Sequence, residues 1–103
     1  MELDLCGEKV VNNPDAQILA DLIEKYSGRP DFYVIPGVDW QTYMQAAADS
    51  QTGYRIEYRD GSPMTHYYCA HERIERSDVI RAMTMYLKRD SRWRNELLWH
   101  PMI

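Results

Sequence analysis

The sequence of 103 residues is poor in the side chains and motifs that carry covalent chemistry. It has two cysteines and three histidines, and it contains no P-loop, no Gly-x-Gly-x-x-Gly and no Gly-x-Ser-x-Gly motif. Its carboxylate pairs do not lie in apolar stretches of the kind that raise a pKa for acid–base catalysis. We therefore expect a chain that is not an enzyme and has no catalytic residues.

The nearest approach to a metal or nucleophile site is the group His66, Cys69 and His71. If these residues lie on one strand, Cys69 and His71 share a face while His66 points to the other, because side chains alternate along a strand. Two ligands do not make a zinc site, and no group is placed to orient His71 as a base for Cys69. The sequence therefore predicts no metal and no cofactor.

Long apolar runs and an N-terminal hydrophobic signal segment are also lacking, so we expect no membrane span. Two cysteines, with nothing that requires a disulfide, suggest a reducing cytoplasm. Basic residues are outnumbered 12 to 16, which gives a net charge of −4. Nucleic-acid binders need a basic surface, so we expect a basic protein partner, although solubility alone also explains an acidic balance.

Tyrosine, by contrast, is abundant, and the turn residues divide the chain into short periodic segments. Asn13 before Pro14 predicts a helix start and Gly28 its end, with one apolar stripe between them. The run 32–35 (FYVI) predicts a strand closed by Pro36-Gly37. The stripe comprises Ile18, Leu19, Leu22, Ile23 and Tyr26.

Residues 38–49 fit two periodicities. As a strand, one face holds Val38, Trp40, Met44, Ala46 and Ala48, and as a helix Trp40, Tyr43, Met44, Ala47 and Ala48 align. We favour the strand because the following segment 49–53 (DSQTG) is typical of a hairpin loop.

The segment 54–59 then alternates cleanly, with Tyr54, Ile56 and Tyr58 on one face. Asp60-Gly61 predicts a hairpin turn, and residues 64–71 the return strand.

A second helix is predicted to begin at Ser77-Asp78 and to end near Asp90, with a second apolar stripe along one side. We expect Trp93, Trp99 and the leucines between them to cover the edge of the core. Together these elements predict a single α+β domain over residues 1–103: a mainly antiparallel four-stranded meander with an N-terminal and a C-terminal helix packed on it. The second stripe comprises Val79, Ile80, Met83, Tyr86 and Leu87.

The ordered motifs from Gly53 to Trp99 resemble a family of bacterial immunity proteins. The resemblance is carried by the strand GYRIEYRDG, the return strand with HYY, the helix SDVIRAMTMYL and the ending WRNELLW. Members of this family neighbour deaminase-superfamily toxins in polymorphic-toxin and contact-dependent competition systems. The resemblance implies a cytoplasmic bacterial inhibitor that binds a cognate toxin domain and occludes its active site. The alternative is a non-catalytic adaptor or effector-chaperone subunit of a secretion system.

Two surfaces are candidates for partner binding. One is the strand face opposite the predicted core, and the other is the set of acidic loops. We expect a monomer or a weak dimer, since an exposed edge strand could pair with a copy of itself. The candidate residues are Arg55, Glu57, Arg59, His66 and Tyr68 on the strand face, and Asp39, Asp49 and Asp60 in the loops.

Overall fold

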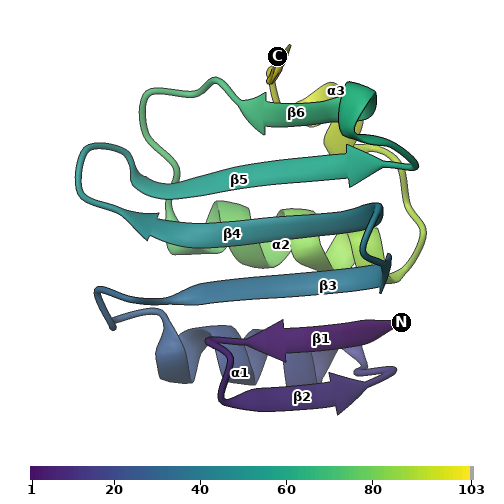
Figure 1. Ribbon diagram of the computed structural model, residues 1–103. Coiled ribbons are helices and arrows are strands. Elements are labelled where there is room, and N and C mark those ends of the chain that lie inside the picture. Colours follow the sequence, from purple (N-terminus) through teal and green to yellow (C-terminus); the bar gives the residue numbers. More distant parts are fainter. Residues whose placement is uncertain (103) are drawn as a thin grey trace.

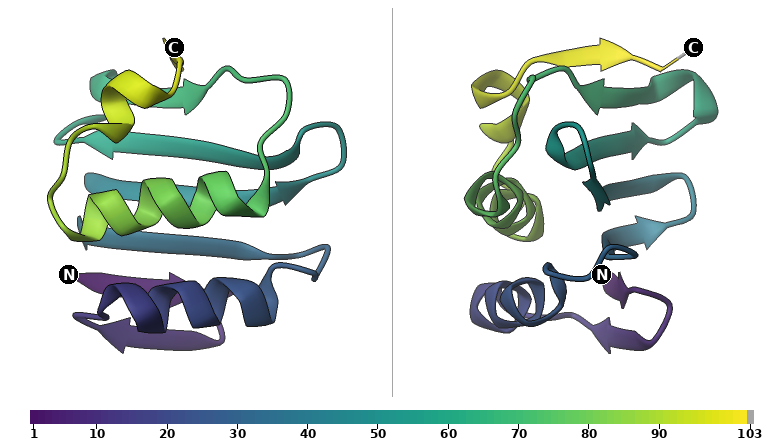
Figure 2. Two further views of the ribbon diagram at one scale, coloured as in Figure 1. Left: turned by 180° about the vertical axis from the view of Figure 1, so that it is seen from behind. Right: turned by 90° about the vertical axis from the view of Figure 1, so that its left-hand side faces the viewer.

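The computed structural model describes residues 1–102, which form a seven-stranded antiparallel sheet with three α-helices on one of its faces (Figures 1 and 2). The strands are β1 (Glu2–Leu5), β2 (Lys9–Asn12), β3 (Tyr33–Asp39), β4 (Thr42–Asp49), β5 (Gly53–Asp60), β6 (His66–Cys69) and β7 (Trp99–Pro101). The helices are α1 (Ala16–Tyr26), α2 (Arg76–Leu87) and α3 (Trp93–Glu96), and a 3₁₀ turn, η1 (Pro63–Thr65), precedes β6. The α+β class and the antiparallel sheet are thus confirmed.

The sheet is wider than the predicted four-stranded meander. Its order is β2-β1-β3-β4-β5-β6-β7, so the four predicted strands form its centre and three further short strands extend it at both ends. The β1–β2 hairpin precedes α1, which means that the first element is a strand pair rather than a helix (Figure 1). These added strands have only three or four residues each, and strands that short give little periodicity to detect.

Helix α1 confirms the first predicted helix, with a later start. Its N-cap is Asp15, whose carboxylate accepts a hydrogen bond from the Ile18 N–H at 2.8 Å, whereas Asn13 lies before the helix at a positive φ of 49°. Leu19 and Ile23 are fully buried against the sheet. Ile18, which was predicted in the same stripe, is 43% exposed.

Helix α2 confirms the second predicted helix, again with a shifted N-terminus. Its N-cap is Glu75, whose backbone N–H donates to the Asp78 carboxylate at 2.8 Å, and the helix ends at Leu87 rather than near Asp90. Both helices lie on the same side of the sheet, so the opposite face carries no helix within residues 1–102 (Figure 2). None of the helices in this range is long and apolar enough to cross a bilayer.

Residues 38–49 form a strand and a turn, not a helix. Strand β3 does not end at Pro36-Gly37 as predicted but continues to Asp39, and the turn to β4 lies at 40–41. Val34 pairs with Ala46 of β4 and Gly37 pairs with Tyr43, while Pro36 lies between these two pairs. A β-bulge follows between Gly37 and Asp39. This irregular pairing tolerates Pro36, which has no N–H to donate.

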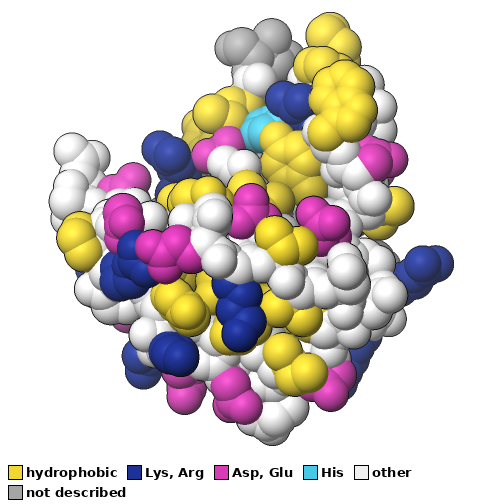
Figure 3. Space-filling model, turned by 60° about the horizontal axis from the view of Figure 1, so that its bottom comes forward, with side chains coloured by type: hydrophobic (Ala, Val, Ile, Leu, Met, Phe, Trp, Pro, Cys, Tyr) yellow, Lys and Arg dark blue, Asp and Glu magenta, His cyan; other side chains and the backbone are white. Residues whose placement is uncertain are grey.

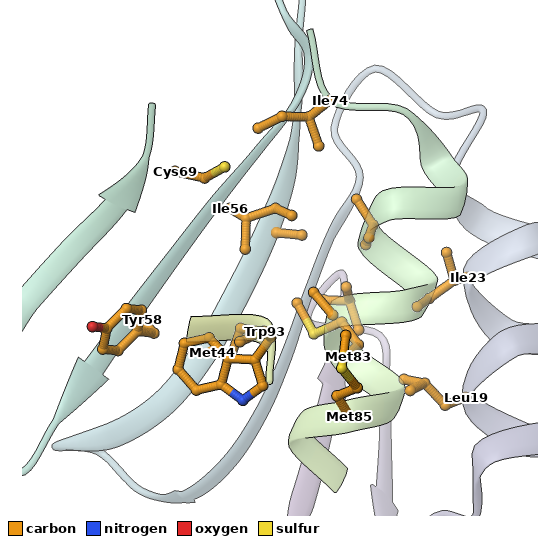
Figure 4. Close-up of a cluster of buried hydrophobic side chains, with 14 of the residues drawn as sticks. Leu19, Ile23, Met44, Ile56, Tyr58, Cys69, Ile74, Met83, Met85 and Trp93 are labelled. Carbon is orange, nitrogen blue, oxygen red and sulfur yellow. The ribbon is translucent and has the colours of Figure 1, made fainter. Parts of the chain in front are cut away.

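The core lies between the sheet and the helices and contains the apolar residues of β4, β5 and α2 (Figure 4). The predicted face of Tyr54, Ile56 and Tyr58 points into it, although Tyr54 is only partly buried. Trp93 is the buried tryptophan at 3% exposure, and it packs edge-on against Tyr58 at 4.8 Å between ring centroids. Trp99, predicted with Trp93 to cover the edge of the core, is half-buried on β7 and packs against the rings of Tyr58 and Trp93.

Candidate binding face

The strand face opposite the helices, which we call the open face, brings together five of the eight predicted partner-binding residues. Arg59 pairs with His66 across β5 and β6, and Glu57 pairs with Tyr68. Arg55 lies two residues before Glu57 on β5 and therefore points to the same face. The alternation of β5 and the β5–β6 register explain why these residues form one group.

Glu57 and His66 form a buried polar pair at the centre of this group. The His66 Nε2 atom lies 2.8 Å from Glu57 Oε1, and the two side chains are 8% and 6% exposed. Arg55 Nε forms an ion pair with the other Glu57 oxygen at 3.0 Å, so each oxygen of the carboxylate has a partner. A buried carboxylate requires such partners, because an unpaired charge would be strongly destabilising there.

The hydrogen bonds of His66 show which ring nitrogen accepts and which one donates. Arg59 donates from Nε to His66 Nδ1 at 3.1 Å, and a guanidinium is always a donor, so Nδ1 is the acceptor. His66 Nε2 therefore carries the proton that is donated to Glu57. Because both ring nitrogens are engaged, His66 offers a substrate neither a free lone pair nor a free proton.

Arg59 extends the network to the β3–β4 turn. It donates from a terminal nitrogen to the Gln41 side-chain oxygen at 3.0 Å, and its guanidinium lies 5.7 Å from the centre of the Tyr43 ring. We call the set Arg55, Glu57, Arg59, Gln41 and His66 the polar network. Its contacts link side chains of β5 and β6 to one another and, through Arg59 and Gln41, to the β3–β4 turn.

The predicted acidic loops do not form a single patch. Asp39 and Asp60 flank Thr42 at one end of β4, while Asp49 ends that strand about 23 Å away at the usual strand rise. Asp49 accepts hydrogen bonds from the N–H groups of Gln51 and Thr52, and these bonds hold its pKa below the usual range. Asp60 pairs with Arg94 at 3.2 Å. Asp39 and Asp49 form no ion pair within residues 1–102, and Asp39 lies at the β3–β4 end of the open face.

A hollow on the β1–β3–β4 part of the open face was not predicted. It has a volume of about 520 Å³. Gly37 lies in its floor between Glu2 and Tyr43, where the packing is tight: a Cβ at this position would lie 3.0 Å from the Tyr43 Cβ. The hollow is lined by Ile35, Val38, Trp40 and Tyr43, with Glu2, Asp4 and Asp39 at its rim.

Two lining residues of this hollow are unusually exposed. Trp40 is 77% exposed and Val38 63% exposed, both at the β3–β4 turn. Figure 3 brings the β2 edge of the sheet forward, and exposed hydrophobic and acidic side chains are interspersed over that surface. A sequence signal for the hollow does exist: Glu2 and Asp4 alternate with the buried Leu3 and Leu5, as expected of a strand with one polar face.

Cys69 faces the core and His66 lies on the opposite face of β6, which confirms the predicted alternation between these two residues, and burial raises the pKa of the Cys69 thiol. His71 lies beyond the end of β6 and accepts a hydrogen bond from the Leu98 N–H at 3.1 Å. No group of three or more potential ligands in residues 1–102 is arranged to hold a metal ion.

Comparison of the chain with protein-family models, with curated proteins and with solved structures finds no match. The open face presents exposed aromatic rings, a fixed polar network and acidic groups without counter-charges, which is a composition suited to protein recognition.

Proposed function

We propose that this protein is an immunity protein that binds and neutralises a cognate bacterial toxin domain by covering its active site with the open face. The toxin would be a deaminase that acts on nucleic acid or nucleotides, as the resemblance over Gly53–Trp99 implies. The protein itself has no catalytic role in this proposal. It acts in the cytoplasm as a stoichiometric inhibitor.

The observation that carries the proposal is the uncovered sheet face with its exposed aromatic and charged residues. Both helices pack on the other side, so a surface spanning the strands is free for a partner (Figure 2). Trp, Tyr and Arg are the residue types that most often dominate binding energy in protein interfaces. Trp40, Tyr43, Tyr68 and Arg55 all lie on or beside this face.

The charge distribution supports a basic partner. The chain has a net charge of −4, and the hollow is bordered by acidic residues. Enzymes that act on nucleic acid need a basic substrate groove. An acidic inhibitor is steered toward such a groove and competes there with the phosphate backbone.

Co-expression with the toxin domain encoded next to this protein tests the proposal. We expect growth rescue and co-purification with the unchanged protein, and loss of both with the double variant Trp40→Glu/Tyr68→Ala, which changes an exposed residue of the hollow and leaves the polar network intact. Arg76→Glu is the control, because it also introduces a glutamate, but at the start of α2 in the helix layer. It should rescue growth fully.

Two results would contradict the proposal. The first is failure of the unchanged protein to rescue or to co-purify. The second is equal loss of rescue by Arg76→Glu, which would place the interface on the helix layer. Binding to a secretion-system subunit while the toxin stays active would favour the adaptor function instead.

A further inference from the structure

We propose that the hollow at the β3–β4 turn receives an arginine side chain of the partner protein. This inference deepens the proposed function, because it names the group that the open face recognises. The occupant is deduced from two independent properties of the hollow, its aromatic lining and its uncompensated negative charge. A third property, the fixed position of the turn, makes the hollow ready to bind.

The aromatic lining suits a flat cation. Trp40 stands at the turn with 77% of its surface exposed, and Tyr43 lies on the neighbouring strand β4 in the same hollow. A guanidinium stacks on indole and phenol rings through cation–π attraction, and its planar shape makes it a better fit to a ring than a lysine ammonium. Val38 and Ile35 add apolar surface for the methylene groups of an arginine side chain.

The rim supplies carboxylates with free acceptor atoms. Within residues 1–102, Glu2, Asp4 and Asp39 form no ion pair, and no lysine or arginine lines the hollow. Asp4 accepts from the Gly7 N–H through Oδ1, and Asp39 accepts from the Gln41 N–H through Oδ1, which leaves the second oxygen of each available. A guanidinium has five N–H donors, so one arginine can donate to the free oxygens of more than one of these carboxylates.

The turn that carries Trp40 is held in place before any partner arrives. The side chain of Gln41 accepts from Arg59 at 3.0 Å, and its backbone oxygen accepts from the Gly61 N–H at 2.8 Å. Asp39 closes the turn through its bond to the Gln41 N–H at 2.8 Å. A site fixed in this way loses little conformational freedom on binding.

A direct test uses a short peptide and does not depend on the toxin. The protein labelled with ¹⁵N is titrated with acetyl-Gly-Arg-Gly-amide and, as a matched uncharged probe, acetyl-Gly-Gln-Gly-amide. We expect the arginine peptide to shift the indole N–H signal of Trp40, identified by its loss in Trp40→Phe, at millimolar concentration. The glutamine peptide should shift it much less. Equal shifts with both peptides would overturn the inference.

A second test measures affinity for the adjacent toxin domain by calorimetry. Trp40→Ala should weaken binding by about 30-fold or more, as for a central interface residue, and Trp40→Phe by much less. Asp39→Asn, which keeps the bond to the Gln41 N–H, should weaken it by about tenfold. Ile18→Ala on α1 is the control for an exposed apolar residue and should leave affinity unchanged.

The two tests separate the inference from the proposed function. Tight binding of the toxin that is insensitive to Trp40→Ala would overturn the arginine site and leave the immunity function standing. If this protein bound the arginine peptide selectively but did not bind the toxin domain, the arginine site would be supported and the immunity function contradicted.

Discussion

The open face has two halves, one on β5 and β6 and one on β1 and the β3–β4 turn, and their carboxylates differ in burial and in ion pairing. On β5 and β6, the Glu57 carboxylate is buried, accepts a hydrogen bond from His66 and forms an ion pair with Arg55. On β1 and the β3–β4 turn, Glu2 and Asp39 are exposed and have no cationic partner within residues 1–102. One half therefore satisfies its charges within the fold, while the other holds carboxylates without a counter-charge in the described residues.

This difference separates residues that hold the sheet together from residues free to bind. A buried carboxylate that loses a partner destabilises the protein strongly, whereas an exposed carboxylate contributes little to stability. Substitutions in the polar network should thus change the free energy of unfolding, and substitutions at the hollow should change binding. Tyr43 lies at the boundary, since it lines the hollow and also contacts Arg59.

The largest effect is expected for Glu57→Gln. The amide is neutral, so the ion pair with Arg55 is lost, and its NH₂ group turns toward either Arg55 or the His66 N–H that the carboxylate accepted from. We expect a loss of about 2 kcal/mol in the free energy of unfolding, measured by urea denaturation. The exposed partner offers the control: Arg55→Gln should cost less than about 1 kcal/mol. A Glu57→Gln protein as stable as the original would show that the polar network does not stabilise the sheet.

An intermediate effect is expected for Tyr43→Ala, and it should appear in both kinds of measurement. Loss of the ring removes the contact with Arg59 and should lower the free energy of unfolding by about 1 kcal/mol. The same variant should weaken toxin binding in calorimetry, because the hollow loses one of its rings. Tyr43→Phe should restore both, since the ring rather than the hydroxyl makes these contacts. If the alanine variant lost stability alone, Tyr43 would belong to the polar network and not to the hollow.

The polar network could be predicted in part, because it depends on the alternation within β5. That alternation placed Arg55, Glu57 and Arg59 on one face, and the Asp60-Gly61 turn brought the next strand beside them. The burial of Glu57 and His66 could not be predicted. It depends on the register between β5 and β6 and on how the neighbouring side chains cover the pair.

The hollow could not be predicted from the sequence because its residues are far apart in the chain. Glu2 reaches the hollow only because β1 pairs with β3 over a separation of more than thirty residues. Trp40 was grouped with Met44 by a period of two that runs across the 40–41 turn, where strand alternation no longer holds. A bulge after Gly37 shifts the register further. Local alternation marks the polar face of β1, but it does not show that this face lies beside the β3–β4 turn.

The smallest effect, and one of opposite sign, is expected for Glu2→Gln. This change makes the same chemical replacement as Glu57→Gln, but at an exposed carboxylate beside the acidic residues Asp4 and Asp39. Removing the charge relieves repulsion among like charges, so the free energy of unfolding should rise by no more than about 0.5 kcal/mol at low salt. The gain should vanish at high salt, where exposed charges are screened. Urea denaturation at both salt concentrations measures it, and a loss of stability comparable to that of Glu57→Gln would mean that both halves of the open face use their carboxylates to hold the fold.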